Sequence, residues 1–303
     1  EAPVKFIARN AEQAGISSHV YDDTVANPTI DNIEEALKMY KDKGCQAIIA
    51  FGGGSPMDCA KGVGARVARP NLTIPQMRGL LKVMKKIPLL IAVPTTAGTG
   101  SETTIAAVIS NPRTHEKYAV NDFHLVPKYA VLDPLITVGL PPHITATTGM
   151  DALTHAVEAY VGRSNTKETR QAAHKAVKLI HENLYTAYID GGNLTARSNM
   201  LTAAFYAGIA FTKAYVGYVH AIAHTLGGYY RIPHGLANAV ILPYVLDYYG
   251  ETAHQPLAEL ADLIGITAQG ESTAEKAGKF IAWIRDLQAS MNIPVKLEGI
   301  QEA

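Results

Sequence analysis

The fold class is decided by the stretch Gln46-Ala-Ile-Ile-Ala-Phe-Gly-Gly-Gly-Ser-Pro-Met-Asp58, in which a short apolar run leads directly into a glycine-rich turn and a helix start. Residues 46–51 predict a strand buried on both faces. We expect Ser55 to cap the following helix, with Asp58 completing a capping-box pattern. The free N–H groups of such a helix start bind anions such as a pyrophosphate. A tight turn capped only for stability is the alternative, because the stretch is neither a GxGxxG fingerprint nor a P-loop.

A second polar loop follows the next apolar run. Residues 88–93 predict another buried strand, which leads into Pro94-Thr-Thr-Ala-Gly-Thr-Gly-Ser-Glu-Thr-Thr104. Short hydroxyl side chains beside backbone N–H groups suit hydrogen bonds to phosphates, although a polar surface loop would have the same composition. Ligands of open α/β sheets bind outside the carboxyl ends of the strands. Two such loops together therefore predict a nucleotide site.

The two halves of the chain differ in their pattern of elements. Up to about residue 140, expected strands at 46–51, 88–93 and 129–132 alternate with helical patterns at 29–43 and 58–68, which indicates a parallel sheet in an α/β domain. The pair Pro141-Pro142 is a natural boundary, because proline disfavours helix in the residue before it. We expect an α/β domain over residues 1–140 and an all-helical domain over 141–303, with helices at 144–161, 166–188, 195–211, 215–226, 235–249, 256–265 and 273–291.

The helical half carries acidic and histidine side chains at the spacing of metal ligands. Asp151 and His155 are four residues apart, hence on one helix face, and Glu158 continues the same polar stripe. A second apolar helix carries His220 and His224, which are also four residues apart, and His234 begins the helix after it. A carboxylate and three imidazoles suit a borderline divalent ion such as Zn²⁺ or Fe²⁺. The candidates are Asp151, His155, His220, His224 and His234.

Composition excludes several classes of protein. The 303 residues contain 27 Lys+Arg and 27 Asp+Glu, so the neutral chain has no general attraction for nucleic acid or an anionic membrane. Its longest wholly aliphatic run, residues 89–93, is far short of the ~20 residues that cross a bilayer. The two cysteines, Cys45 and Cys59, lie in or beside expected buried elements, which favours a reducing, cytoplasmic location over a disulfide framework.

Four motifs in this order carry a resemblance to a known family. They are Gly52-Gly-Gly-Ser-Pro-x-Asp58, Pro94-Thr-Thr-x-Gly-Thr99, Gly149-x-Asp-Ala-x-x-His155, and His220-x-x-x-His-x-Leu-Gly followed by Pro233-His-Gly235. The sequence from about residue 26 to residue 243 thereby resembles the iron-containing (group III) alcohol dehydrogenases, which share a fold with glycerol dehydrogenases and dehydroquinate synthases.

The resemblance implies a dinucleotide-binding domain, a helical metal-binding domain and a role for each motif residue. His224 would lie near the nicotinamide as a catalytic proton relay, apart from the metal. The metal, Fe²⁺ or Zn²⁺, would be held by Asp151, His155, His220 and His234, whereas spacing alone leaves His224 among the candidates. The contacts to NAD or NADP would come from Asn27, Gly54, Ser55, Thr95, Thr96, Thr104, Lys117 and Ile136.

The expected activity is hydride transfer that interconverts a small primary alcohol or diol and its aldehyde. A glycerol-dehydrogenase-like or dehydroquinate-synthase-like enzyme of the same fold, a metal-dependent hydrolase, and a non-enzymatic binding protein remain alternatives. Partners are expected to be a small alcohol or aldehyde and a second copy of the chain, since the family forms dimers or larger assemblies. Family chains carry a first nucleotide-binding segment and further C-terminal helix that this sequence lacks, so we expect a piece of a longer chain.

Overall fold

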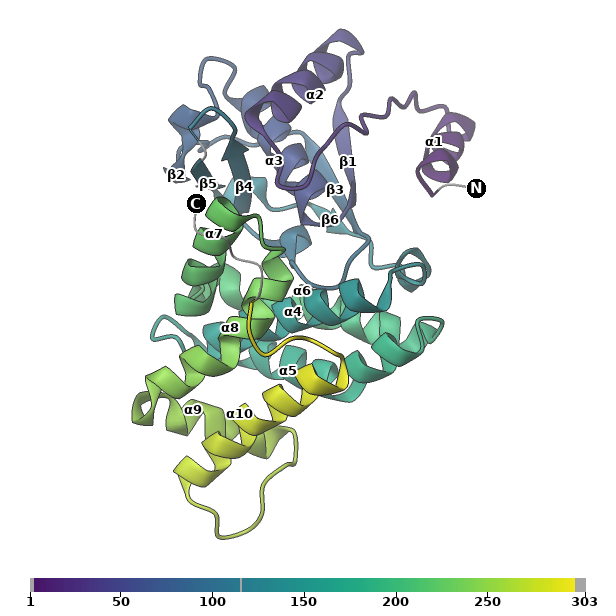
Figure 1. Cartoon of the computed structure of the whole chain (residues 1–303). Coiled ribbons are helices and arrows are strands. Elements are labelled where there is room, and N and C mark those ends of the chain that lie inside the picture. Colours follow the sequence, from purple (N-terminus) through teal and green to yellow (C-terminus); the bar gives the residue numbers. More distant parts are fainter. Residues whose placement is uncertain (1–2, 115, 298–303) are drawn as a thin grey trace. The chain divides into compact units, whose positions relative to one another are not determined.

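The structure, a computed structural model, describes residues 3–114 and 116–297. The chain divides into two compact units (Figure 1). The first unit comprises Glu1–Thr95 and Thr104–Val131, and the second comprises Thr96–Thr103 and Leu132–Ala303. The threonine-rich loop is therefore divided between the two units.

The first unit contains the parallel sheet expected from the sequence. Its order is β1-β3-β6; the helix α3 packs on β1 and β3, and the helix α2 packs on α3. The register pairs Gly52 with Pro94, so the glycine-rich loop and the threonine-rich loop leave the sheet side by side. The strands are β1 (Ala47–Gly52), β3 (Leu89–Pro94) and β6 (Tyr129–Ala130), and the helices of this unit are α1 (Pro3–Gln13), α2 (Ile30–Asp42) and α3 (Gly54–Ala68).

A second, small sheet in the first unit was not expected. Its order is β2-β5-β4, and β4 and β5 pair antiparallel. The helix α3 packs against β1, β3 and β4, which explains why most of its residues are buried. The strands of this sheet are β2 (Gly79–Leu80), β4 (Ala106–Asn111) and β5 (Glu116–Asn121).

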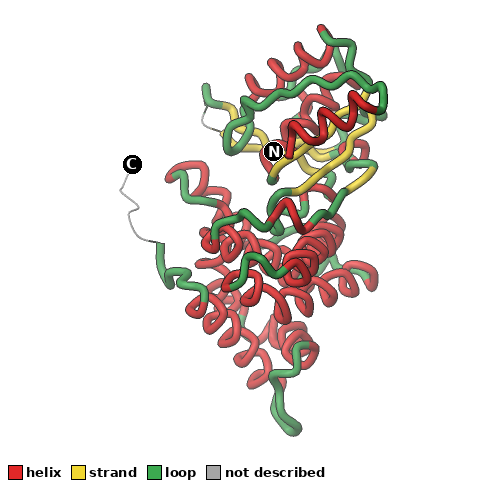
Figure 2. Tube along the Cα trace, turned by 90° about the vertical axis from the view of Figure 1, so that its right-hand side faces the viewer, coloured by secondary structure: helices red, strands yellow, loops and turns green. Residues whose placement is uncertain are grey.

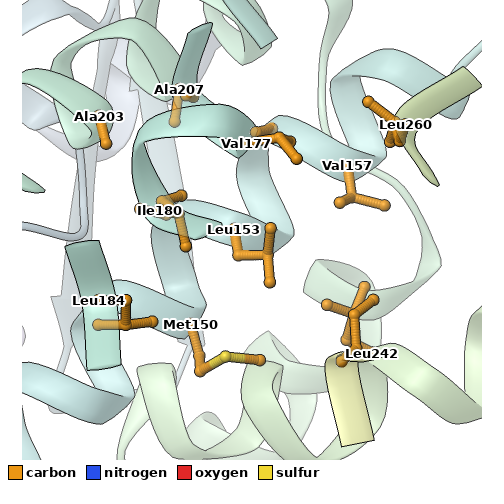
Figure 3. Packing of buried hydrophobic residues seen from close by; sticks show 14 of the residues in the cluster. Met150, Leu153, Val157, Val177, Ile180, Leu184, Ala203, Ala207, Leu242 and Leu260 are labelled. Atoms are coloured by element: carbon orange, nitrogen blue, oxygen red, sulfur yellow. The ribbon is translucent and has the colours of Figure 1, made fainter. Parts of the chain in front are cut away.

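The described part of the second unit is helical, with strands absent (Figure 2). Its α-helices are α4 (Pro142–Val161), α5 (Lys167–Ile189), α6 (Leu194–Ala214), α7 (Tyr218–Tyr230), α8 (His234–Tyr249), α9 (Glu251–Leu263) and α10 (Thr273–Ser290). The helix α4 is the centre of this unit, because it packs against α5, α6, α8 and α9. Figure 3 shows Leu153 of α4 between side chains of α5 and α8. Among the described residues, every helix is too short or too polar to span a bilayer.

Two details of the expected fold are wrong. The helix α9 begins at Glu251, one turn before Pro256, so this proline lies inside the helix and does not begin it. The strands β1 and β3 were expected to be buried on both faces, yet Ile49 and Leu89 are 48% and 43% exposed while Ala50 and Leu90 are buried. Alternating burial of this kind shows one covered face of the sheet.

Candidate metal centre

The helix α4 presents a polar stripe inside an apolar core. Its neighbouring apolar side chains pack into the largest hydrophobic cluster of the second unit. Asp151, His155 and Glu158 follow one another at intervals of four and three residues, so they share one side of the helix. They are 2%, 5% and 5% exposed. Polar groups buried this deeply need partners, because an unpaired one costs several kcal/mol.

The partners come from α7 and α8. His220 is the third residue of α7, and His234 is the first residue of α8, directly after Pro233. Nε2 of His220 lies 3.8 Å from Oδ1 of Asp151, and Nε2 of His234 lies 3.6 Å from the same oxygen. His155 stacks on His220 with ring centroids 4.4 Å apart. The helices α4 and α7 and the first residue of α8 thus bring the four side chains together.

The four groups form a compact ligand set. One ligand atom from each of Asp151, His155, His220 and His234 lies within 4.8 Å of the others. Three of the side chains are buried, while the side chain of His234 is 30% exposed. The cluster is therefore closed by protein on most sides and accessible beside His234.

The electrostatics favour the ionisation states that metal binding needs. Burial lowers the pKa of His155 to about 3, against the opposing effect of the Asp151 carboxylate, so this ring is neutral at neutral pH. Burial works against ionisation of Asp151, but the histidines and a hydrogen bond from Asn238 outweigh it and leave the pKa of Asp151 below its ordinary value. A carboxylate and a neutral imidazole are the forms that coordinate a cation.

Asn238 tests whether the residues fit a cation. Its Nδ2 lies 2.6 Å from Oδ1 of Asp151 and 3.1 Å from Nε2 of both His220 and His234. Oδ1 of Asp151 and Nε2 of both histidines thus lie around one amide nitrogen, which carries only two hydrogens. A set of Asp and His side chains whose ligand atoms converge in this way fits a divalent ion such as Fe²⁺ or Zn²⁺.

His224 lies beside the cluster and outside the four-residue set. Its ring centroid is 5.0 Å from that of His234 and 6.2 Å from that of His220. The two histidines of α7, four residues apart, therefore occupy different places. His220 is buried beside Asp151, whereas His224 is half-buried and lies beside His234.

In the first unit, three of the residues expected to bind a nucleotide lie together. Asn27 has a positive φ of 57°, its N–H donates to Oγ of Ser55 at 3.0 Å, and its Oδ1 accepts from Nζ of Lys117 at 2.6 Å. The expectation that Ser55 is the N-cap is wrong, because α3 begins at Gly54 and its N-cap makes no side-chain hydrogen bond. The hydroxyl of Ser55 is used by Asn27, a residue distant in sequence.

The glycine-rich turn closes tightly in front of α3. Gly52 has a φ of 149°, and a Cβ there would lie 2.5 Å from Cγ of Pro56. Asp58 does not complete a capping box either, since its Oδ2 accepts from the backbone N–H of Val108 at 3.1 Å. The N-cap of α3, Gly53, makes no side-chain hydrogen bond, and Gly54 lies at this anion-attracting end of the helix.

The remaining expected nucleotide contacts are spread over both units. Thr95 follows β3, and its N–H donates to the carbonyl of Gly52 at 2.9 Å. Thr104 is buried in the first unit. Thr96 and Ile136 belong to the second unit, where Ile136 lies in a short helical turn, Pro134–Thr137. A common site for these residues stays a prediction.

Three residues near the two sites were given no role from the sequence. Lys61 is fully buried, and its Nζ donates to the carbonyl and hydroxyl of Thr104 and to the carbonyl of Ala106, at 2.8–3.0 Å. Asn238 and Glu158 contact the metal candidates directly. The sequence carries a signal for two of them: Glu158 continues the polar stripe of Asp151 and His155, and Asn238 stands four residues after His234 on the same helix.

Comparison with known proteins identifies the family. Residues 3–134 match the iron-containing alcohol dehydrogenases, and residues 145–302 match the C-terminal part of the Fe-containing alcohol dehydrogenase family. The chain belongs to the iron-containing alcohol dehydrogenase family. The 1,3-propanediol dehydrogenase of Klebsiella pneumoniae is 41% identical over 293 residues, which cover 96% of this chain and 76% of that protein.

Two further members of the family extend this comparison. The NAD-dependent methanol dehydrogenase of Bacillus methanolicus is 36% identical over 95% of this chain and 75% of its own length. The crystal structure of a 1,3-propanediol oxidoreductase superposes with a TM-score of 0.94 at 40% identity, over 97% of this chain and 77% of that one. The resemblance, the fold class and the alcohol dehydrogenase activity expected from the sequence are confirmed. The iron expected from the family agrees with the four-residue cluster.

Proposed function

We propose that this member of the family interconverts a small primary alcohol or diol and its aldehyde at the cluster of Asp151, His155, His220 and His234. The observation that carries the proposal is the convergence of Oδ1 of Asp151 and Nε2 of His220 and His234 on one point, within a cluster whose His234 side chain is 30% exposed. The names of the relatives, which include 1,3-propanediol and methanol dehydrogenases, support a small alcohol as the substrate.

The chemistry divides between bound groups and the chain. When bound, the cation supplies Lewis acidity toward the substrate oxygen and the nicotinamide supplies the hydride acceptor or donor. Asp151, His155 and His220 would hold the ion from the core side, where all three side chains are buried. His234, whose side chain is 30% exposed, would hold it from the accessible side, so an alcohol would approach there.

His224 is suited to move the proton of the alcohol. It lies beside His234, and histidine exchanges a proton near neutral pH more readily than other side chains. In alcohol oxidation, a ring nitrogen of His224 accepts the hydroxyl proton and passes it to solvent, and aldehyde reduction runs in the opposite direction. The role does not require His224 to touch the metal.

The dinucleotide would be held by the residues that the sequence motifs predict as its contacts. Asn27, Ser55 and Lys117 lie together at the open start of α3, and Gly54 provides a backbone N–H group there. We propose NAD as the cofactor because a relative is named NAD-dependent, with NADP as the alternative. Thr95, Thr96, Thr104 and Ile136 complete the proposed contacts.

Three broader features belong to the same proposal. The two units support domains near residues 1–140 and 141–303, one for the dinucleotide and one for the metal. The cysteine content supports a cytoplasmic location, because both thiols are free. Assembly as a homodimer or larger homo-oligomer follows from membership of the family.

Metal analysis combined with a nicotinamide assay tests the proposal. Purified protein should contain one divalent ion per chain, and alcohols should produce reduced nicotinamide, detected by its near-ultraviolet absorbance. The variant His234→Ala should lose both, because it removes one of four ligands. Titration with NADH and NADPH distinguishes the cofactors. Full turnover by protein without metal would refute the proposed site.

A further inference from the structure

We propose that Glu158 is a positioning residue that fixes the ring of His220 for metal binding, and that Gly217 is a glycine to make room for it. Oε2 of Glu158 lies 2.6 Å from Nδ1 of His220, and Oε1 accepts from the backbone N–H of Val219 at 2.7 Å. Both side chains are almost fully buried. The inference rests on the proposed function, since it concerns a ligand of the same metal.

The first contact selects the tautomer of His220. Oε1 of Glu158 accepts from Val219, and the 2.6 Å contact of Oε2 with Nδ1 of His220 has the same sense when Nδ1 carries the hydrogen and donates it to the carboxylate. In the neutral ring, Nε2 then carries the lone pair. This is the nitrogen that faces Oδ1 of Asp151 at 3.8 Å. The carboxylate thereby makes the correct nitrogen available as a ligand and holds the plane of the ring.

The second contact fixes where the helix that carries His220 begins. The α7 N-cap is Gly217, which has no side chain to cap the first N–H groups. Glu158 supplies the missing acceptor from α4 by binding the N–H of Val219, the second residue of α7. A carboxylate at a helix N-terminus also interacts favourably with the helix dipole. One side chain therefore sets the start of α7 and the orientation of its third residue.

Gly217 permits this approach. A Cβ at position 217 would lie 2.8 Å from Oε1 of Glu158 and 3.2 Å from the hydroxyl of Tyr249. Since such contacts are too short, any larger residue would displace the carboxylate from Val219. The backbone of Gly217 has a φ of −115°, so its conformation is open to other residues and the requirement comes from space.

The substitution Glu158→Gln tests the proposal with little change in shape. A glutamine has one acceptor oxygen, so it cannot serve the N–H of Val219 and Nδ1–H of His220 together. If the oxygen serves Val219, the amide NH₂ faces His220 and forces the other tautomer, with Nε2–H directed at the ligands. Loss of such a partner typically weakens metal binding by about 10- to 100-fold.

The measurements are made on chelator-treated protein. Titration with Zn²⁺ or Co²⁺ gives the dissociation constant, and the visible spectrum of bound Co²⁺ reports the ligand geometry. Ring ¹⁵N chemical shifts report the His220 tautomer without any metal. We expect Glu158→Gln to weaken binding and to reduce the population of the Nδ1–H tautomer, with circular dichroism confirming the fold. The matched control Glu259→Gln changes a partly buried carboxylate that accepts from Tyr160 at 2.6 Å, and it should leave metal affinity unchanged.

A second pair of variants keeps the proposal testable if Glu158→Gln does not fold. Gly217→Ala should weaken metal binding by about 10-fold, because it displaces the carboxylate and changes no charge. Gly228→Ala, on the same helix with open space around its Cβ position, should not. The positioning role is overturned if folded Glu158→Gln keeps both the metal affinity and the His220 tautomer of the unsubstituted protein. The same pair of results in Gly217→Ala overturns it as well. Absence of metal binding by the unsubstituted chain would refute the proposed function instead, and the tautomer measurement would still decide this inference.

Discussion

Acidification should destabilise the metal-free protein strongly, because the fold holds His155 neutral. Its pKa in the folded chain is about 3, lowered by burial, whereas an unfolded histidine titrates near 6.5. Between these values the unfolded chain binds a proton that the folded chain does not. The free energy of unfolding therefore rises with pH in this range, and it falls as the pH is lowered through the unfolded value.

The two pKa values fix the size of the effect. From about pH 7.5 to about pH 5, the unfolded His155 gains nearly a full proton while the buried ring gains almost none, which lowers the free energy of unfolding by about 2 kcal/mol. Continued to about pH 3, where the folded ring also begins to bind the proton, the loss reaches about 4 kcal/mol. Asp151 adds nothing in the first interval, since a lowered carboxyl pKa affects stability only near and below its ordinary value of 3.8.

Urea unfolding of chelator-treated protein at the two pH values measures the effect. The substitution His155→Gln keeps a polar side chain and removes the titration, so its loss of stability on acidification should be smaller by about 2 kcal/mol. The control His19→Gln alters an exposed side chain and should retain the full loss. An equal pH dependence in His155→Gln and the unsubstituted protein would refute the conclusion that burial keeps this ring neutral.

Three further substitutions have distinct expected outcomes. Asp151→Ala should abolish both metal content and activity, measured by elemental analysis and nicotinamide absorbance, and a metal-free variant with normal turnover would contradict the ligand role. His224→Ala should keep the metal and lose rate, whereas loss of metal would show that His224 is a ligand. Lys61→Met should lower the free energy of unfolding by about 1–3 kcal/mol, because the buried oxygens of Thr104 lose a donor. In the urea measurement, Lys38→Met at an exposed position is the control, and an equal effect there would contradict the assignment.

The sequence predicted the elements whose signal is local. The apolar run of β1 and the helical periodicity of α4 to α8 place these elements within a few residues of their observed bounds. The capping role of Ser55 could not be judged locally, because its hydroxyl serves Asn27 across the fold. The antiparallel pair β4 and β5 was missed since short strands of mixed polarity give a weak pattern.

The residues of the candidate site were likewise predictable where their signal is local. Asp151 and His155 were predicted from their spacing of four residues on one helix, and His234 from its place at the start of the next helix. Spacing could not separate His220 from His224, because the difference depends on how α7 crosses α4. The partnership of Glu158 with the start of α7 depends on the same crossing and was not predicted.

The charges of the second unit explain why a cation belongs at this point of the core. Asp151 and Glu158 are both buried, and their ion-pair partners among the described residues are two histidines, His220 and His234. Two carboxylates without a fixed positive charge are costly in an apolar interior. A divalent ion held by Asp151 and the three rings would balance both, directly for Asp151 and through the ring of His220 for Glu158. The cluster that suits alcohol chemistry is thus also the place where the core needs two positive charges, so binding of the ion and stability of the helical unit are coupled.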